Sequence, residues 1–333
     1  MSTPNKICND NSASKSNDDG VCEMTDMLQN ISTADVEETN ISVCANCGKE
    51  GSDINNTCNK CNSVMYCNAA CKKKHKNKHK KQCERIVAAL HEEALFKQPP
   101  TLEDCPICFQ LLPSHEKGSI YKSCCGKTIC SGCWYANVLI DIKKQLCAFC
   151  RTQAPKTEKE SRRRIIKRIE AGDAVAIYNL GCDYTNGTDG YPIDYIKALE
   201  LFQRAGELVG HAPSYYNIGN AYRFGGRGVE VDRKKAINNW ELAAMGGDVQ
   251  ARHNLGCEEE VQGNMNRAIK HWIIAVKSGN TCSLDAIKDL CTVGQATKED
   301  YSTALQAYQA YLKEIKSAQR DRAAADDYNF RYY

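Results

Sequence analysis

The spacing of the cysteines constrains this chain more than any other feature of its sequence. Fifteen of the 21 cysteines lie between Cys44 and Cys150, and most of them form pairs with two residues between the partners. Cysteines that serve only as small apolar side chains would be spread through the cores, so this clustering predicts metal binding. Residues 1–10 lack the apolar core of a signal peptide. We therefore expect an intracellular, reducing compartment, cytoplasmic or nuclear, in which thiols stay free.

The first cluster contains eight potential ligands whose spacings suit zinc. Two Cys-x-x-Cys pairs are followed by two pairs in which the ligands stand four residues apart, a spacing that places both side chains on one face of a helix. Eight ligands fill two tetrahedral sites and leave no position for a water, so we expect structural rather than catalytic sites. A module of about forty residues needs such sites, because its apolar core alone is marginal and zinc contributes about 10 kcal/mol per ion in zinc-finger peptides. The ligands are Cys44, Cys47, Cys58, Cys61, Cys67, Cys71, His79 and Cys83.

The order of these ligands, with Tyr66 directly before the fifth, resembles the MYND-type zinc finger over residues 44–83. The resemblance implies that the two sites interleave along the chain. It also implies that the finger binds short proline-containing peptides of partner proteins. The implied ligand sets are Cys44, Cys47, Cys67 and Cys71 for one ion, and Cys58, Cys61, His79 and Cys83 for the other.

The segment 72–81 is strongly basic. It contains seven lysines and no acidic residue, in a chain whose formal net charge is only +3. Such a segment can contact nucleic-acid phosphates or serve as a nuclear import signal. The alternative is a solvated face of the zinc-binding helix, whose lysines balance the negative charge of the thiolate ligands. No aromatic side chain interrupts the lysines, so stacking on bases is not expected, and nucleic acid is the less favoured partner.

A second cluster follows, with eight more candidate ligands. Its Cys-Pro-Ile-Cys and Cys-Ala-Phe-Cys-Arg motifs resemble those of a RING finger, which interleaves two zinc ions, here over residues 105–151. RING fingers usually place Cys-x-His before the fifth ligand, whereas this chain has Lys127 at the histidine position, and a lysine ammonium has no lone pair to offer. Either Cys124 and Cys125 are both ligands, or one site is irregular. The candidate ligands are Cys105, Cys108, Cys124, Cys125, Cys130, Cys133, Cys147 and Cys150.

The resemblance to RING fingers implies a ubiquitin-protein ligase with no catalytic residue of its own. Such a finger holds a ubiquitin-conjugating enzyme and orients its thioester-linked ubiquitin. The implied contact residues are Ile107, Phe149 and Arg151, beside the first and last cysteine pairs. Trp134 is a further candidate, although it directly follows Cys133 and the family's aromatic contact usually lies a few residues later. The alternative is that Ile107, Trp134 and Phe149 only pack the core of this small module.

The carboxyl-terminal half contains an internal repeat. An Asn-Leu-Gly or Asn-Ile-Gly signature follows Tyr178, Tyr216 and His253, which are 38 and 37 residues apart. Alanine followed four positions later by an aromatic residue forms a second signature. Each unit therefore reads as a helix, a loop and a second helix, in which the glycine allows close approach and the aromatic side chain fills the groove between helices. The second signature occurs at Ala198/Phe202, Ala236/Trp240, Ala268/Trp272 and Ala304/Tyr308.

These features resemble the Sel-1-like repeat, an α/α relative of the tetratricopeptide repeat. We expect three regular units over about 171–280, a degraded fourth unit to about 311 and a closing helix over 312–325. Asp194 and Asp232 are expected to cap second helices. The resemblance implies a long concave face that binds other proteins.

The sequence thus predicts a mainly α chain with two small zinc-stabilised modules followed by a helical repeat solenoid. No apolar run is long enough for a transmembrane helix. We interpret the chain as a protein-interaction protein with four zinc ions and no catalytic residue, and as a candidate ubiquitin-protein ligase. The alternatives are a scaffold without enzymatic activity and a nuclear regulator whose basic helix contacts nucleic acid. The expected organisation is a disordered tail over 1–40, a MYND-type finger over 44–83, a helix and linker over 84–100, a RING-like finger over 105–151, repeats over 160–326 and a terminal tail over 327–333.

Overall fold

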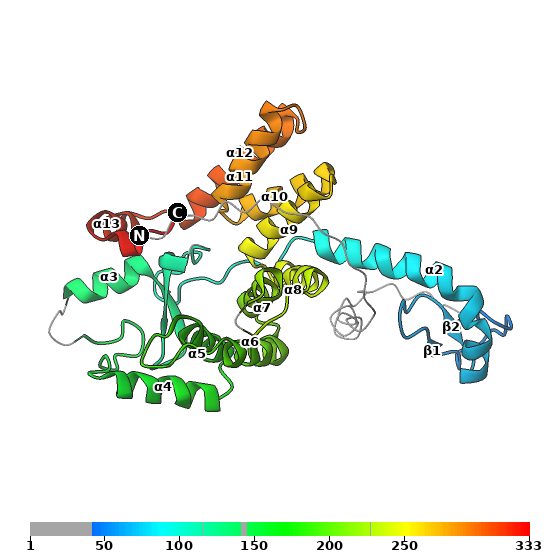
Figure 1. Cartoon of the computed structure of the whole chain (residues 1–333), viewed down its shortest axis with the longest axis horizontal. Helices are drawn as coiled ribbons and strands as arrows, with labels where there is room; N and C mark the ends of the chain where they lie inside the picture. Colours follow the sequence, from blue (N-terminus) through cyan, green and yellow to red (C-terminus); the bar gives the residue numbers. More distant parts are fainter. Residues whose placement is uncertain (1–41, 115, 141–144, 227) are drawn as a thin grey trace. The chain divides into compact units, whose positions relative to one another are not determined.

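The computed structural model describes residues 42–114, 116–140, 145–226 and 228–333. The disordered tail expected over 1–40 lies outside these ranges. The described chain is mainly helical (Figure 1). It divides into two compact units, the first ending at His91 and the second beginning at Glu92.

The first unit holds a small antiparallel hairpin and most of one long helix. Strand β1 (Asn56–Thr57) pairs with β2 (Met65–Tyr66), and helix α2 runs over Ala69–Phe96. The carboxamide oxygen of Asn68 accepts the backbone N–H of Cys71 at 2.9 Å, which satisfies one of the open donors at the start of the helix. Helix α2 begins within the expected finger, continues through Cys83 and ends within the segment 84–100, where we expected a helix and a linker.

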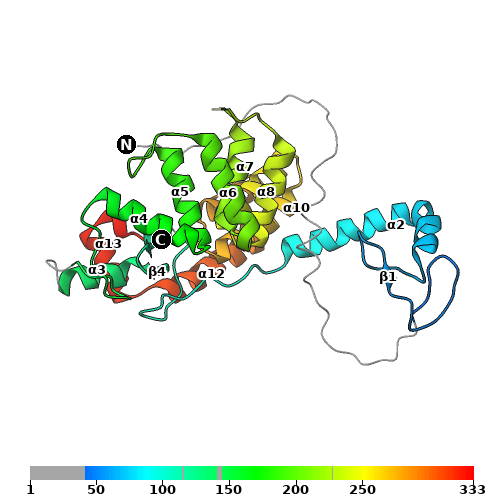
Figure 2. The same cartoon turned by 90° about the horizontal axis from the view of Figure 1, so that it is seen from below.

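The second unit contains the predicted solenoid, built from consecutive pairs of helices (Figure 2). Helix α4 (Glu158–Glu170) precedes the first pair and packs on it. The pairs are α5 (Ala174–Asn186) with α6 (Tyr195–Val209), α7 (Ala212–Phe224) with α8 (Arg233–Met245), α9 (Val249–Val261) with α10 (Met265–Lys277), and α11 (Thr281–Thr292) with α12 (Lys298–Ile315).

The two repeat signatures meet in the core of each of the three regular pairs. A Cβ atom added to Gly219 would lie 2.4 Å from Cδ1 of Trp240, and one added to Gly256 would lie 2.3 Å from Nε1 of Trp272. Only glycine therefore lets the indole of the second helix pack against the first helix at this distance. The alanines of the second signature are buried at every repeat, so this part of the sequence-based expectation is confirmed.

The helix caps of the solenoid also follow the expectation. The carboxylates of Asp194 and Asp232 accept the backbone N–H groups of Lys197 and Lys235, each at 2.9 Å. These bonds fix the start of α6 and α8, because the first N–H groups of a helix have no partner within it.

The end of the chain differs from the expectation. The single closing helix predicted over 312–325 is interrupted, because Lys316 is extended and Ser317 caps a new helix, α13 (Ala318–Asp326). Residues 327–333, expected to form a tail, contain the 3₁₀ helix η2 (Tyr328–Phe330), and the side chain of Tyr332 is only 1% exposed.

The second cysteine-rich module belongs to the same compact unit as the solenoid. It contains η1 (Glu116–Gly118), an antiparallel hairpin of β3 (Ser119–Lys122) and β4 (Lys127–Cys130), and helix α3 (Ser131–Ile140). Helix α13 lies against α3 in both views (Figures 1 and 2).

This module contacts both ends of the solenoid. At the first repeat, the hydroxyl of Tyr121 donates to Oδ2 of Asp173 at 2.7 Å. At the last repeat, the backbone N–H of Ser114 donates to the hydroxyl oxygen of Tyr311 at 3.0 Å, and the Ser114 hydroxyl donates to the carbonyl of Ser278 at 2.6 Å. The sequence indicated modules in series, whereas the structure shows the second module bridging the two ends of the repeat array.

The last turn of α2 also docks on the repeats. Leu95 is fully buried among Trp240, Ala243 and Leu255, and the guanidinium of Arg252 donates to its carbonyl oxygen at 2.5 Å. This arginine satisfies a carbonyl that the end of the helix leaves open. Within the described ranges, no helix has the length and apolar character needed to cross a membrane.

Candidate metal centres

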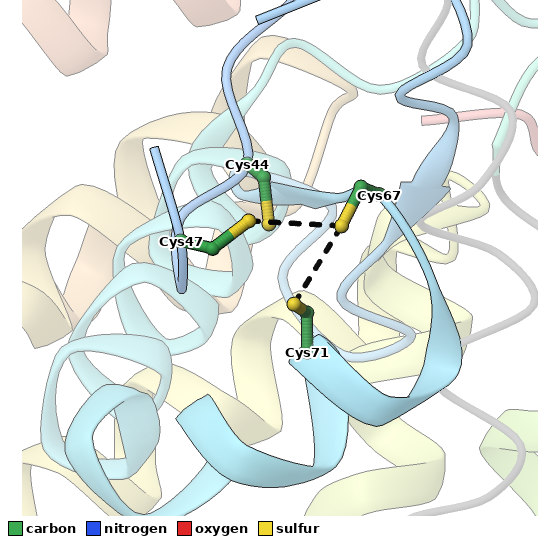
Figure 3. Close-up of side chains that lie close together, drawn as sticks. All are labelled: Cys44, Cys47, Cys67 and Cys71. Atoms are coloured by element: carbon green, nitrogen blue, oxygen red, sulfur yellow. Dashed lines mark hydrogen bonds between the residues drawn. The ribbon is translucent and has the colours of Figure 1, made fainter. Parts of the chain in front are cut away.

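The first metal-ligand group lies at the amino-terminal end of α2. Figure 3 shows four cysteine side chains that converge, with Cys67 at the end of a strand and Cys71 in the first turn of the helix. Sγ of Cys67 lies 3.7 Å from that of Cys47 and 3.5 Å from that of Cys71. The group is Cys44, Cys47, Cys67 and Cys71, the set that the MYND resemblance implied for one ion.

The second group uses the third and fourth turns of the same helix. His79 and Cys83 stand four residues apart on α2 and face a cysteine pair from the β1 region. Nε2 of His79 lies 3.2 Å from Sγ of Cys61, and Sγ of Cys83 lies 3.7 Å from that of Cys58. Since α2 supplies ligands to both groups, metal binding would fix the helix to the two Cys-x-x-Cys turns that supply the other ligands, Cys44/Cys47 and Cys58/Cys61.

The second module contains two further groups of four cysteines. Cys124 and Cys125 both belong to one group. This position agrees with the alternative in which both cysteines are ligands. Lys127 is exposed and outside the group. Sγ of Cys124 lies 3.4 Å from that of Cys150 and 4.0 Å from that of Cys125. The two groups are Cys105, Cys108, Cys130 and Cys133, and Cys124, Cys125, Cys147 and Cys150.

These distances fit a bound zinc ion. Zinc lies about 2.3 Å from each thiolate, so the sulfurs of a tetrahedral site are about 3.8 Å apart. The measured separations between neighbouring sulfurs run from 3.4 Å for Cys124 and Cys150 to 4.0 Å for Cys124 and Cys125. Every one of the sixteen residues offers its donor atom within 4.8 Å of the other three in its group, and the cysteines are not joined in disulfides. The described chain therefore contains four sites whose donors suit zinc.

Four of the cysteine pairs share one backbone turn. In each, the residue after the second cysteine has a positive φ, and its N–H donates to the carbonyl of the first cysteine at 2.9 or 3.0 Å. A side chain in this region of φ costs roughly 1–2 kcal/mol relative to glycine, so a stabilising interaction must hold the turn. The residues are Gly48 (71°) and Asn62 (50°) in the first cluster, and Phe109 (55°) and Arg151 (61°) in the second.

One thiol in each group has a lowered pKa. Burial raises the pKa of Cys44, but hydrogen bonds from the backbone N–H groups of Cys67, Cys47 and Asn46 lower it by more. The resulting pKa is about 6. The pKa of Cys150 is also lowered to about 6, because hydrogen bonds from Thr152 outweigh the effect of burial. Donors aimed at sulfur favour the thiolate, which is the form that binds zinc. The pKa of Cys58 falls to about 6 by the same balance, and that of Cys105 is lowered chiefly by hydrogen bonding with Cys130.

The expected partner-contact residues lie around the second module. Ile107 and Trp134 are half-buried and pack against the cluster of Cys105, Leu112 and Ile129, which agrees with the alternative of core packing for these two. The side chain of Phe149 is 44% exposed, and Arg151 is exposed.

Sequence reasoning missed one exposed aromatic residue of this module. Phe109 is 78% exposed and has a positive φ. Its position directly after a Cys-x-x-Cys pair was the available signal, because the corresponding residue of the last pair is Arg151. Phe109 and Phe149 thus present aromatic side chains to solvent from the first and last cysteine turns.

The basic segment lies on α2 between metal ligands. The helix buries His79 and Cys83 against the finger, while six of the seven lysines in this segment are exposed. The remaining one, Lys72, donates to the side-chain oxygens of Asn56 and Asn59. The exposed residues are Lys73, Lys74, Lys76, Lys78, Lys80 and Lys81.

Comparison with known families identifies two parts of the chain. The family model of the MYND finger matches residues 44–83, and that of the Sel1 repeat matches 174–208, 212–248 and 249–280. The second cysteine cluster lies outside these matches. No curated protein matches the chain.

Among the similar solved structures, three illustrate the low sequence identity of these matches. A Sel1 repeat protein from Oxalobacter formigenes is 22% identical, with 58% of this chain and 73% of that chain covered and a TM-score of 0.39. The protective antigen c5321 of uropathogenic Escherichia coli, which displays an SLR fold, is 22% identical with a TM-score of 0.41; the match covers 59% of this chain but only 41% of that one. The immunity protein Pa5087 of Pseudomonas aeruginosa is 21% identical, with 59% and 68% covered and a TM-score of 0.35.

The chain therefore contains a MYND finger and a solenoid of Sel1 repeats. Both are protein-interaction modules in general. The four ligand groups and these two matches define a zinc-binding protein-interaction protein.

Proposed function

We propose that this protein is a RING-type ubiquitin-protein ligase whose MYND finger and repeat solenoid recognise partners or substrates. Four zinc ions would be held by the sixteen ligands, two in each module. The ions supply rigidity rather than chemistry, because four protein ligands close each site. The reaction would take place on a bound conjugating enzyme, which the module orients.

The interleaving of the two ligand groups in the second module supports this proposal most directly. The two groups alternate along the chain. Cys105 and Cys108 share a group with Cys130 and Cys133, and Cys124 and Cys125 of the other group lie between these two pairs in the sequence. Such an arrangement ties the first and last turns of the module to one hairpin and helix. It would hold Phe149 and Arg151 in fixed positions on the surface, where a protein partner can reach them.

The proposed contacts to the conjugating enzyme are the exposed Phe149 and Arg151, with Ile107 and Trp134 supporting them from the core. The guanidinium of Arg151 donates to the side-chain oxygen of Asn137 on α3 at 3.2 Å, which restrains a long side chain before binding and lowers the entropy cost of complex formation. Exposed aromatic and arginine side chains are also the residue types that carry most energy in protein interfaces.

An ubiquitination assay with a panel of conjugating enzymes tests the proposal. The full chain should form ubiquitin chains, and Phe149→Ala or Arg151→Ala should reduce the rate at least tenfold while leaving the zinc content unchanged. Phe224→Ala, which changes an exposed aromatic at the end of α7 in the solenoid, serves as a control.

The result of this assay also distinguishes a ligase from the main alternative, a scaffold. A protein that binds all its zinc but forms no ubiquitin chains with any conjugating enzyme, or forms them equally well with Phe149→Ala and Arg151→Ala, is a scaffold without enzymatic activity. In that case the second module is a docking module only.

The six exposed lysines of α2 favour one further candidate function, binding of nucleic acid. These ammonium groups lie within about ten residues of one helix, a density that attracts phosphate backbones. Binding of duplex DNA or RNA should then weaken steeply with salt and disappear when the six lysines are replaced by glutamine. Binding that does not respond to salt would contradict this function.

A further inference from the structure

The side chain of Arg320 is a buried cation beside one of the candidate metal sites. It lies in the first turns of α13 and is 0% exposed. Its Nη1 donates to the carbonyl oxygens of Ile315 at 2.6 Å and Leu111 at 2.8 Å, and its Nη2 to the carbonyl of Gln110 at 3.4 Å. Nη2 also lies 3.9 Å from Sγ of Cys108.

The partners of Arg320 leave its charge without a carboxylate. Its hydrogen-bond acceptors in the described chain are backbone carbonyls and sulfur, and its Nε is buried without a partner. A buried arginine is costly unless an opposite charge lies close to it. Elsewhere in the solenoid, the buried carboxylate of Glu258 has two arginines, Arg223 and Arg233, within 2.9 Å. Among the residues that the structure describes, no carboxylate forms an ion pair with Arg320.

A zinc ion bound by four thiolates supplies the missing charge. The ion carries two positive charges and the thiolates four negative ones, so a filled site of Cys105, Cys108, Cys130 and Cys133 has a net charge of about −2. The groups that surround metal ligands orient them and adjust the affinity of the site. Arg320 is placed to do so for Cys108. It also holds the backbone that follows the turn at Phe109, through the carbonyls of Gln110 and Leu111.

The segment around Arg320 is closely fitted to the module. A Cβ atom on Gly132 of α3 would lie 2.9 Å from Cγ of Arg320 and 3.0 Å from its backbone nitrogen, so the two helices meet where α3 has no side chain. The hydroxyl of Ser131 donates to the carbonyl of Phe330 at 3.3 Å, and the hydroxyl of Tyr135 donates to Asp326. The whole segment Ser317–Tyr332 thus covers the helix that follows Cys130.

We propose that Ser317–Tyr332 is a metal-dependent clasp, in which Arg320 is the positioning residue that neutralises the filled site of Cys105, Cys108, Cys130 and Cys133. Zinc at this site favours docking of the clasp, and the docked clasp slows loss of that zinc. The two effects are equal in free energy, because coupling between two binding events is reciprocal. This inference rests on zinc binding by the second module, which is part of the function proposed above.

Zinc release from the full-length protein tests the clasp. We expect the coloured chelator 4-(2-pyridylazo)resorcinol to withdraw one of the four ions roughly ten- to a hundredfold faster from Arg320→Met than from the wild type, the range seen when groups around metal ligands are removed. Arg320→Lys keeps a charge and should restore slower release in part. Arg322→Met is the matched control, because Arg322 lies on the same helix and is exposed; its release profile should match the wild type.

Hydrogen exchange provides a second test that does not use an arginine variant. Cys108→Ser should raise amide exchange throughout Ser317–Tyr332, whereas Cys150→Ser, which removes a ligand from the other group of the same module, should leave exchange in this segment near the wild-type level. Equal opening in both variants, or release from Arg320→Met at the wild-type rate, would overturn the clasp. Elemental analysis of the wild type separates this failure from failure of the metal assignment, since only the latter lowers the zinc content to two ions per chain.

Discussion

Nη2 of Arg320 lies 3.9 Å from Sγ of Cys108, although 212 positions separate the two residues in the chain. The chain thus returns from the end of the solenoid to the first cysteine turn of the second module. At the other end of the solenoid, Tyr121 of this module reaches Asp173 before the first repeat. The second module is therefore a structural part of the repeat array, and its loss should affect the stability of both ends.

Tyr121→Phe should destabilise the second unit. The substitution removes a 2.7 Å hydrogen bond to Asp173, whose carboxylate also caps α5 and accepts from Arg168. Hydrogen bonds to charged groups contribute about 1.5–3 kcal/mol, and we expect a loss near the lower end because Arg168 remains. Urea unfolding measures it, with Tyr328→Phe, at a 61% exposed position, as the control. Equal midpoints for the two variants would mean that this contact contributes nothing.

Gly256→Ala should destabilise the third repeat by about 1–3 kcal/mol, the usual cost of overpacking a core. The new Cβ would meet the indole of Trp272 at 2.3 Å, and this ring is fully buried. Thermal unfolding followed by circular dichroism gives the difference, and Ser302→Ala on the exposed face of α12 is a control expected within about 0.5 kcal/mol of the wild type. A stable Gly256→Ala protein would show that the two helices can separate at little cost.

Buried histidines should make the solenoid less stable in acid. Burial lowers the pKa of His271 to about 3, and Arg252 and Arg267 act in the same direction. Between pH 6.5 and 3 the unfolded chain binds a proton that the folded chain does not. The stability from this group is therefore complete above pH 6.5 and is lost as pH falls toward 3, at about 1.4 kcal/mol per pH unit. His211, with a pKa of about 4, adds to the loss.

One carboxylate opposes this trend. Burial raises the pKa of Asp248 to about 6, so the folded chain binds an extra proton between pH 3.8 and 6, and the stability this group contributes is lost as pH rises through 6. Comparing His271→Gln with the wild type separates the effect of the histidine from that of Asp248. Between pH 6.5 and 5, the variant's unfolding free energy should fall less steeply with decreasing pH, by about 1.4 kcal/mol per pH unit, which corresponds to one proton. Parallel curves for the two proteins would contradict the assignment.

Removal of one ligand from the first module should unfold the amino-terminal part of α2. Cys83→Ser leaves the second group with three ligands, and we expect increased proteolysis between Ala69 and Cys83 together with a lower zinc content. Cys282→Ser changes an exposed cysteine outside all four groups and should behave as the wild type. Resistance of Cys83→Ser to protease would show that the helix does not depend on the metal.

Local patterns in the sequence were enough to predict much of the fold. Ligand spacing located the sixteen metal-binding candidates, because ligands within one turn or one helical turn must be close in space. The pairing of glycine with an aromatic residue located the solenoid core for a similar reason, as Gly219 and Trp240 illustrate. Capping by Asp194 and Asp232 depends on three neighbouring residues only.

Contacts between distant segments could not be predicted in this way. Nothing near Arg320 in the sequence indicates that its charge belongs beside Cys108. Nothing near Leu95 indicates that its carbonyl accepts a hydrogen bond from Arg252. The break at Lys316 was missed for the same reason. The residues after it turn back because α13 packs against α3, a contact made across almost two hundred residues.

Zinc stoichiometry tests the central claim most directly. Native mass spectrometry of the full-length protein should find four zinc ions per chain. Cys83→Ser and Cys150→Ser should each lower the number, the first by loss from the MYND finger and the second by loss from the second module. A wild-type protein with two zinc ions, whose number is unchanged by Cys150→Ser, would contradict the account of the second module as a zinc-stabilised part of the array.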